Sequence, residues 1–362
     1  MGSKVNLNER NDSRVFRTTY SYFLPKFSRS ANPLYFCQEA KKNDMKILIT
    51  GGAGFIGSNL ADVLLSSGHS VLVIDNYKTS RRDNLSPHKN LLVVEGSIED
   101  KNLVDKHFSD FMPDAVVHAA ASYKDPQDWE EDTLTNVMGT INVVRASQKT
   151  KVKRFVYFQT SLCYGLQPVE QPITLNHPLY SGKYSGGSSY AISKTAGEQY
   201  IELSGLDFIS FRLANAYGPR NLSGPLPTFY HRITNGKPCF VMNTRRDFIF
   251  ISDLVEVVVK AINGMGTRGY YHIASGADYS IKELYDAALK ALDVTPAVPV
   301  EERERGVDDV FTILIDPSKT NKDFQWNVTT PLEAGIKKAI EWYKKYGITQ
   351  TYTHLKVEEH KQ

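Results

Sequence analysis

Residues 46–65 constrain the fold more than any other segment of the sequence. Residues 46–50 form a short, apolar, β-branched run, which stops at Gly51-Gly-Ala-Gly-Phe-Ile-Gly57, and residues 58–65 then have helical spacing. This pattern indicates a strand, a glycine-rich turn and a helix. Further apolar runs follow, with helical stretches between them, at 71–74, 91–94, 115–118, 155–158 and 208–213. The alternation predicts an α/β fold, a Rossmann-type doubly wound parallel sheet with helices on both faces.

The pattern changes from Gly218 onward, where connections rich in proline and glycine separate helical stretches at 281–292 and 332–346. We therefore expect a smaller mixed α/β C-terminal domain that binds the substrate. The expected boundaries are an extension outside the fold at 1–44, a dinucleotide-binding domain at 45–220 rejoined by about 247–277, the substrate domain at 221–347, and a tail at 348–362.

Composition excludes several classes of protein. The 43 Lys and Arg residues nearly balance the 40 Asp and Glu residues, and a net charge of +3 does not indicate nucleic-acid binding. Cys37, Cys163 and Cys239 are far apart and form no C-x-x-C, which argues against disulfides and zinc and favours a reducing cytoplasm. No stretch of 18 apolar residues predicts a membrane span, and the scattered histidines indicate no metal site.

The glycine loop is the first candidate binding site. Gly51 permits the tight turn, Gly54 lets backbone N–H groups approach a pyrophosphate, and Gly57 lets the helix lie close to the strand. Asp75 ends the next strand, 18 residues beyond Gly57, where it would accept hydrogen bonds from an adenosine ribose and repel a 2′-phosphate. NAD is therefore favoured over NADP, although Arg81 and Arg82 keep NADP open and Asp75 could instead serve as a cap or turn residue. The full set of expected cofactor contacts is Gly51, Gly54, Phe55, Ile56, Gly57, Asp75, Asn76, Ala119, Ala120, Tyr190 and Lys194, whereas His118 is expected to be a structural histidine.

A second motif is Tyr190-Ala-Ile-Ser-Lys194. Residues four apart lie on one helical face, so the Lys194 ammonium is expected beside the Tyr190 phenol, where a cation favours the phenolate. Such a pair can act as a general base. By itself this spacing usually marks a solvated helix face, but it gains weight when it follows a dinucleotide loop. Thr160, after the run 155–158, is expected at the carboxyl edge of the sheet, where ligands of such folds bind.

The ordered set of motifs resembles the extended short-chain dehydrogenase/reductases, in the nucleotide-sugar epimerase and dehydratase branch. The motifs are Thr50-Gly-Gly-Ala-Gly-Phe-Ile-Gly57, Asp75, His118-Ala-Ala, Thr160 with Tyr164-Gly165, Tyr190 with Lys194, and Arg212-Leu-Ala-Asn-Ala-Tyr-Gly-Pro219. The resemblance covers about 45–347 and implies that NAD is the cofactor and a nucleotide sugar the substrate. It also implies that Thr160 holds the sugar O4, that Tyr190 is the base and that Lys194 binds the nicotinamide ribose. Asn215 and Arg246 would contact the diphosphate, and Lys124 and Ser161 would also contact the substrate.

The branch can be narrowed by the two residues that follow Thr160. In sugar 4,6-dehydratases an Asp-Glu pair stands there, whereas this chain has Ser161 and Leu162, which cannot move protons at C5 or C6. The resemblance therefore favours 4-epimerisation of a UDP-hexose, a UDP-hexuronic acid or an N-acetylated form. Tyr123-Lys-Asp-Pro126 and Asp316-Pro-Ser-Lys-Thr320 are similar to epimerases of bacterial surface-polysaccharide synthesis. A nucleotide-sugar 4-ketoreductase or dehydrogenase, a 4,6-dehydratase and a non-catalytic dinucleotide sensor remain alternatives.

Two departures from the family pattern affect the expected substrate site. Gly306, with Arg305 beside it, stands where relatives carry a second diphosphate-binding arginine, and Ile313 stands where narrow-specificity galactose epimerases have tyrosine. The smaller Ile313 would leave space for an N-acetyl group, or it is simply a core residue. The helical stretches 132–148 and 190–204 match the two helices that relatives pair across a two-fold axis, so a homodimer is expected.

Overall fold

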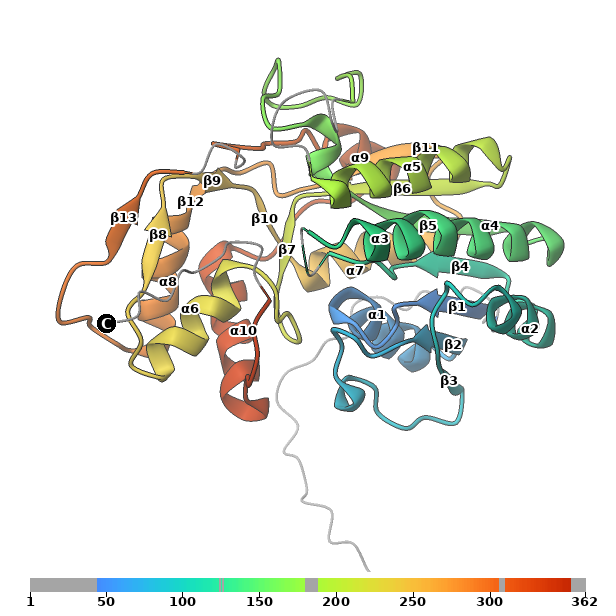
Figure 1. Cartoon of the computed structure of the whole chain (residues 1–362), viewed down its shortest axis with the longest axis horizontal. Coiled ribbons are helices and arrows are strands. Elements are labelled where there is room, and N and C mark those ends of the chain that lie inside the picture. Colours follow the sequence, from blue (N-terminus) through green and yellow to red (C-terminus); the bar gives the residue numbers. More distant parts are fainter. Residues whose placement is uncertain (1–43, 124, 126, 180–187, 306–309, 353–362) are drawn as a thin grey trace, which may run out of the picture. The chain divides into compact units, whose positions relative to one another are not determined.

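The computed structural model describes residues 44–123, 125, 127–179, 188–305 and 310–352 (Figure 1). Lys124, Gly306 and Cys37 lie outside the described residues. So do nearly all of the expected N-terminal extension and most of the expected tail.

The core of the fold is a seven-stranded parallel sheet in the order β11-β6-β5-β4-β1-β2-β3. This sheet confirms the expected Rossmann-type fold, and each of the six predicted strands overlaps an observed one. Their bounds are β1 Lys46–Thr50, β2 Ser70–Asp75, β3 Leu91–Glu95, β4 Ala115–His118, β5 Arg154–Thr160 and β6 Phe208–Leu213. The seventh strand, β11 Gly269–Ile273, pairs with β6 at the sheet edge and returns the second half of the chain to the sheet.

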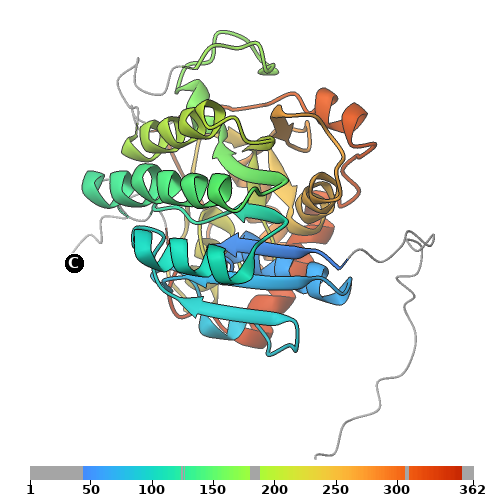
Figure 2. The same cartoon turned by 90° about the vertical axis from the view of Figure 1, so that its right-hand side faces the viewer.

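Helices cover both faces of this sheet. On one face lie α2 Lys101–Phe111, α4 Thr140–Lys149 and α5 Ser189–Leu203, which run side by side in Figure 2. On the other face lie α1 Phe55–Ser66 and α7 Ile251–Ile262. Successive side chains of β1 point to opposite faces of the sheet, since Ile47 belongs to one buried core and Leu48 to the other. Burial on both faces explains why the central strands read as continuous apolar runs.

The expected helix over 132–148 differs from the observed one. The observed helix begins earlier, with α3 Trp129–Asp132. It continues through a π-helical segment, η2 Thr133–Gly139, into α4. Asp128 caps its start by accepting a hydrogen bond from the backbone N–H of Glu131 at 2.9 Å. Helical periodicity in a sequence does not distinguish a short π-helical insertion from a regular helix.

Besides α7 and β11, the described part of the second half contains a group of three helices and three small two-stranded sheets. The helices α6 Pro225–Thr234, α8 Ile281–Leu292 and α10 Leu332–Tyr346 pack together. The pairs are β7 Asn215–Tyr217 with β10 Phe248–Phe250, β8 Phe240–Met242 with β13 Glu301–Arg303, and β9 Arg245–Arg246 with β12 Tyr279–Ser280. Short helices also occur in the loops of both halves, namely η1 Arg82–Asn84, η3 Ser161–Tyr164 and α9 Ser318–Asp323. This half is mixed α/β.

Candidate active site

One large pocket brings the expected site residues together. Its volume is about 1440 Å³, and it extends from the glycine loop, past the carboxyl ends of the sheet strands, to α6. It can therefore hold more than one small-molecule ligand. Every expected site residue that the structure describes lines it, namely Gly51, Gly54, Phe55, Ile56, Gly57, Asp75, Asn76, Ala119, Ala120, Thr160, Ser161, Tyr190, Lys194, Asn215 and Arg246.

The glycine loop forms a backbone cradle at the start of α1. Gly51 has φ +66°, and a Cβ there would stand 2.7 Å from the Cα of Ala120. A Cβ on Gly57 would stand 2.5 Å from the carbonyl oxygen of Gly51, so α1 approaches the loop too closely for any side chain. Gly54 precedes α1 and offers no side-chain cap, which leaves the first N–H groups of the helix to a ligand. This cradle fits the pyrophosphate of a dinucleotide.

Asp75 holds the loop as well as lining the pocket. Its carboxylate accepts hydrogen bonds from the backbone N–H of Ala53 at 2.9 Å and of Tyr77 at 2.8 Å, and from the Ser80 hydroxyl at 2.7 Å. Asp75 thus serves as a turn residue, one of the two roles that the sequence leaves open, and its position at the pocket leaves the ribose role compatible with the structure.

Arg81 and Arg82, the two residues that could favour NADP as the cofactor, both form ion pairs with carboxylates. Arg81 forms two hydrogen bonds with Asp83, at 2.8 and 2.6 Å, and Arg82 forms two with Glu95, at 2.7 and 2.6 Å. A 2′-phosphate would have to compete with these bidentate pairs. The structure therefore favours NAD.

His118 ends β4 and is fully buried. The Thr140 hydroxyl lies 2.9 Å from its Nε2 and donates to the carbonyl of Asn136 at 2.7 Å, so Nε2–H must be the donor to Thr140. His118 Nδ1 then accepts from the Thr50 hydroxyl at 2.6 Å. Burial lowers the pKa of His118 to about 3. A neutral histidine with both nitrogens satisfied is structural, as the sequence analysis expects.

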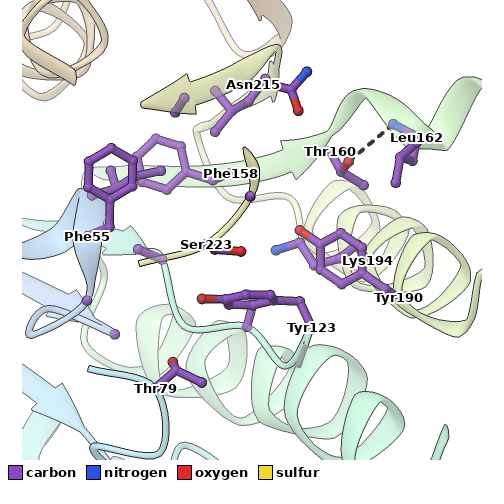
Figure 3. Close-up of a pocket in the computed structure, with 18 of the residues that line it drawn as sticks. Phe55, Thr79, Tyr123, Phe158, Thr160, Leu162, Tyr190, Lys194, Asn215 and Ser223 are labelled. Atoms are coloured by element: carbon purple, nitrogen blue, oxygen red, sulfur yellow. Dashed lines mark hydrogen bonds between the residues drawn. The ribbon is translucent and has the colours of Figure 1, made fainter. Parts of the chain in front are cut away.

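Tyr190 and Lys194 lie one turn apart on α5, and both side chains enter the pocket that Thr160 also lines (Figure 3). Lys194 is only 2% exposed, and its Nζ stands 3.9 Å from the centroid of the Tyr157 ring. Burial lowers the pKa of Lys194 to about 7, although the nearby Glu198 anion partly opposes this shift. The ammonium is thus close to its own titration point in this pocket.

The expected effect of Lys194 on Tyr190 is not seen in the structure. Burial raises the pKa of the Tyr190 phenol above its ordinary value, and the neighbouring Tyr123 and Asp132 raise it further. Desolvation opposes any charge on the phenol, so the cation beside it does not act alone.

Thr160 ends β5 and starts η3, with its hydroxyl accepting a hydrogen bond from the backbone N–H of Leu162 at 3.1 Å (Figure 3). Leu162 lines the pocket two residues after Thr160, and the intervening Ser161 is 7% exposed. The pocket therefore has a hydroxyl and an apolar side chain, and no carboxyl group, at the two positions that follow Thr160.

A buried polar network behind the site was not anticipated from the sequence. Glu198, one turn beyond Lys194, accepts hydrogen bonds from Arg212 at 2.8 and 3.3 Å and from Ser210 at 2.5 Å. Arg212 also donates to the Tyr164 hydroxyl at 2.9 Å, which lies 2.6 Å from His272 Nε2. This network connects the helix that carries Lys194 to the turn that carries Thr160.

The distal wall of the pocket comes from the second half of the chain. Asn215 on β7 donates to the carbonyl of Asp247 at 3.3 Å. Arg246 on β9 donates to the carbonyls of Val310 at 2.9 Å and Phe311 at 3.3 Å, and so supports the segment before Ile313. Ile313 is 4% exposed and lines the pocket while belonging to the core, so both of its expected roles are compatible with the structure.

Three further side chains bring hydroxyls into the pocket, those of Thr79, Tyr123 and Ser223 (Figure 3). The Tyr123 ring packs edge-on against Tyr190 with 6.4 Å between the centroids. Tyr123 begins the motif Tyr123-Lys-Asp-Pro126, but Thr79 and Ser223 lie in loops without any recognisable sequence signal.

No group of three or more His, Cys, Asp or Glu side chains among the described residues could hold a metal ion. No helix in the described part of the chain is long and apolar enough to cross a membrane.

Comparison with known proteins identifies the family. The chain belongs to the NAD dependent epimerase/dehydratase family, whose sequence profile matches residues 47–274. The Bordetella bronchiseptica enzyme WbmH, solved in complex with NAD+, is 52% identical, with a TM-score of 0.81 over 84% of this chain and 100% of that chain. WbmG from the same organism, solved with NAD and UDP, is 44% identical, with a TM-score of 0.79 over 86% and 99% of the two chains.

The relatives of known name have more than one enzymatic activity. The UDP-N-acetyl-alpha-D-glucosaminuronate decarboxylase of Bacillus cytotoxicus is 30% identical over 323 residues, which cover 83% of this chain and 98% of that protein. Others at similar identity are UDP-glucose 4-epimerases, and one is a dTDP-glucose 4,6-dehydratase. The chain is thus an enzyme of the nucleotide-sugar epimerase and dehydratase type. Its cofactor is NAD, which agrees with the backbone cradle at Gly51 and Gly57.

Proposed function

We propose that this enzyme is an NAD-dependent 4-epimerase of a UDP-sugar. The observation that carries the proposal is the meeting of Thr160, Tyr190 and Lys194 at one pocket in which Ser161 and Leu162 occupy the next two positions (Figure 3). One acid/base group and one hydride acceptor suffice to oxidise C4 and reduce it again from the other face of the ring. Removal of a proton from C5 or of a hydroxyl from C6 needs additional proton carriers at those two positions.

The expected cofactor contacts surround the part of the pocket next to α1. The loop from Gly51 to Gly57 would hold the pyrophosphate on its backbone N–H groups, and Asp75 with Asn76 would bind the adenosine ribose. Ala119 and Ala120 would line the cofactor, since small side chains after β4 leave room for it. When bound, NAD supplies the hydride acceptor and donor.

The chain's own residues would handle the proton and the sugar. The Thr160 hydroxyl would hold O4 of the sugar, and Tyr190 would take the proton from O4 and later return it. Lys194 would bind the nicotinamide ribose and contribute positive charge beside the phenol. Because Tyr190 alternates between base and acid, its proton need not leave the pocket during a turnover.

The nucleotide half of the substrate would occupy the distal wall. WbmG has been solved with UDP, which supports UDP as the nucleotide here. Arg246 would bind the diphosphate with Asn215 orienting it, and Lys124 and Ser161 are further proposed contacts. Ile313 at this wall would leave space for an N-acetyl group, and the proposed sugar is a UDP-hexose, a UDP-hexuronic acid or an N-acetylated form.

A panel of UDP-sugars with product stereochemistry read by NMR tests the proposal. We expect inversion at C4 without net production of NADH. Steady consumption of NADH or NADPH would favour the ketoreductase, and a 4-keto-6-deoxy product would favour the dehydratase. Binding of NAD without turnover of any sugar in the panel would favour the sensor.

We also propose that the enzyme is a homodimer. Segments α3, η2 and α5 pack together and expose apolar side chains, with Leu203 at 80% and Trp129 at 67% exposure. The other exposed apolar side chains on these segments are Leu134, Met138, Ile192 and Tyr200. Exposed apolar side chains on helices that pack together are typical of a protein interface. Light scattering at micromolar concentration should give the mass of a dimer, and a monomer mass would reject this proposal.

A further inference from the structure

The chain returns to the pocket after α10. Residues 347–352, which we call the strap, follow this helix and end beside the loop 222–224. The backbone N–H of Tyr352 donates to the carbonyl of Leu222 at 2.8 Å, and its carbonyl accepts from the backbone N–H of Gly224 at 3.0 Å. These two bonds form a parallel bridge between the strap and the loop. All three loop residues line the pocket, yet the proposed mechanism assigns no role to the strap.

The loop 222–224 leads directly into α6, at the distal end of the pocket. This helix begins at Pro225, and Gly224 before it has φ +90° and offers no side-chain cap. Three side chains of α6 also line the pocket, namely those of Leu226, Phe229 and Arg232. Because the bond from Gly224 to Tyr352 holds the backbone at the point where α6 starts, the strap supports this wall of the pocket.

Arg81 holds the other end of the strap. Its guanidinium group donates to the carbonyl of Gly347 at 2.9 Å and to that of Tyr346 at 3.3 Å. It also lies 5.6 Å from the centroid of the Trp342 ring on α10. The last carbonyls of a helix have no partner within the helix, so a cation at this end is favourable. Arg81 follows β2, in a loop whose residue Ser80 lines the pocket.

The strap thus joins two loops that border the pocket from different halves of the chain. One loop, 76–81, follows the expected ribose contact Asp75, and the other, 222–224, brings Ser223 to the pocket (Figure 3). Between the two anchors, Ile348 packs against the hydrophobic core. A short segment that is held at both ends restricts the freedom of the loop it pairs with, and a loop ordered before binding loses less entropy when a ligand arrives.

We propose that Arg81 and Tyr352 are positioning residues, which through the strap hold the loop 222–224 in the arrangement that binds the nucleotide of the substrate. This inference rests on the proposed function, since it takes UDP as that nucleotide. If the loop is paired for only part of the time, the apparent affinity for UDP falls in proportion to the competent fraction. Loss of either anchor therefore weakens UDP binding, although neither side chain needs to contact UDP.

The test compares Tyr352→Pro with Tyr352→Ala in the full chain. Both variants lose the ring, but only proline also loses the N–H that donates to Leu222. A second pair compares Arg81→Gln with Arg82→Gln. Arg82 is the neighbouring arginine and is paired with Glu95, so its replacement removes an ion pair and leaves the strap intact.

Two measurements are made on the NAD-saturated enzyme well below its Tm. Hydrogen exchange, followed by mass spectrometry of peptides that span 222–224, reports the pairing of the loop, and calorimetry with UDP reports the affinity. We expect Tyr352→Pro to exchange faster and to bind UDP more weakly than Tyr352→Ala, each by about two- to tenfold, the range for one neutral hydrogen bond. Arg81→Gln should show the same two changes, and Arg82→Gln should show neither.

The outcomes separate this inference from the proposed function. Equal UDP affinity in Tyr352→Pro and Tyr352→Ala overturns the inference even if the Tm falls, because a merely structural strap would change stability alone. If Tyr352→Pro does not fold, equal UDP affinity in Arg81→Gln and Arg82→Gln overturns it instead. Absence of UDP binding by the wild-type enzyme would contradict the proposed function, and the exchange rates would still decide whether the strap holds the loop.

Discussion

Replacing Glu198 by Gln should cost this enzyme a large part of its stability. Glu198 is 1% exposed and accepts two hydrogen bonds from Arg212, which is itself 4% exposed. Glutamine keeps the shape, but it leaves the Arg212 cation buried without a counter-charge. Removing one partner of a buried ion pair costs about 3–5 kcal/mol. That is a substantial share of a total stability of roughly 5–15 kcal/mol.

The assay is thermal unfolding of the wild-type enzyme and Glu198→Gln in the same buffer. For a chain of 362 residues the unfolding entropy corresponds to roughly 1–2 °C per kcal/mol, so the Tm should fall by about 3–10 °C. The double variant Glu198→Gln with Arg212→Met removes both charges and should recover most of the loss, since a neutral replacement of a buried pair is often tolerated. A fall of less than 2 °C in the single variant would refute the reasoning, because Arg212 would then have another way to stabilise its charge.

Three further predictions concern the chemistry, the substrate and the pH dependence. Tyr190→Phe should lower kcat by roughly two to four orders of magnitude with little change in NAD affinity, as measured by steady-state kinetics and calorimetry; near wild-type turnover would remove Tyr190 from the mechanism. Arg246→Ala should raise KM about ten- to a hundred-fold whatever sugar is attached, because a charge-assisted contact to the diphosphate is worth about 1.5–3 kcal/mol, and an unchanged KM would place the diphosphate elsewhere. Burial holds the pKa of His118 at about 3 and of His272 at about 4, so between these values and 6.5 the unfolded chain binds more protons than the folded protein. The free energy of unfolding from urea titrations should therefore fall as the pH drops from 6.5 towards 4, and a flat profile would show that other groups compensate.

Much of the fold was predictable because its signals are local. The central parallel strands are buried on both faces and read as apolar runs, and the loop from Gly51 to Gly57 requires glycine at positions that the sequence shows directly. Tyr190 and Lys194 were found because their spacing matches one helical turn. The strand β11 was not singled out, since its sequence Gly-Tyr-Tyr-His-Ile has no period that distinguishes it from a loop.

The parts that sequence could not predict depend on contacts between distant segments. The pairing of Glu198 with Arg212 and the contact of Arg81 with Gly347 appear only when the segments that carry them are brought together. Likewise, the raised pKa of Tyr190 follows from its desolvation, which spacing along one helix does not report. Sequence spacing thus predicted which residues lie close together. Their pKa values and their burial depend on the surrounding structure.

Turnover in D2O tests the central claim most directly. If the enzyme is a 4-epimerase with Tyr190 as its one proton carrier, only the oxygen-bound proton exchanges with solvent, and hydrogen returns to C4 without passing through water. NMR of the product should therefore show inversion at C4 and no carbon-bound deuterium anywhere on the ring. Deuterium at C5 or C6 would contradict the account, because Ser161 and Leu162 give the pocket no group to exchange protons at those carbons.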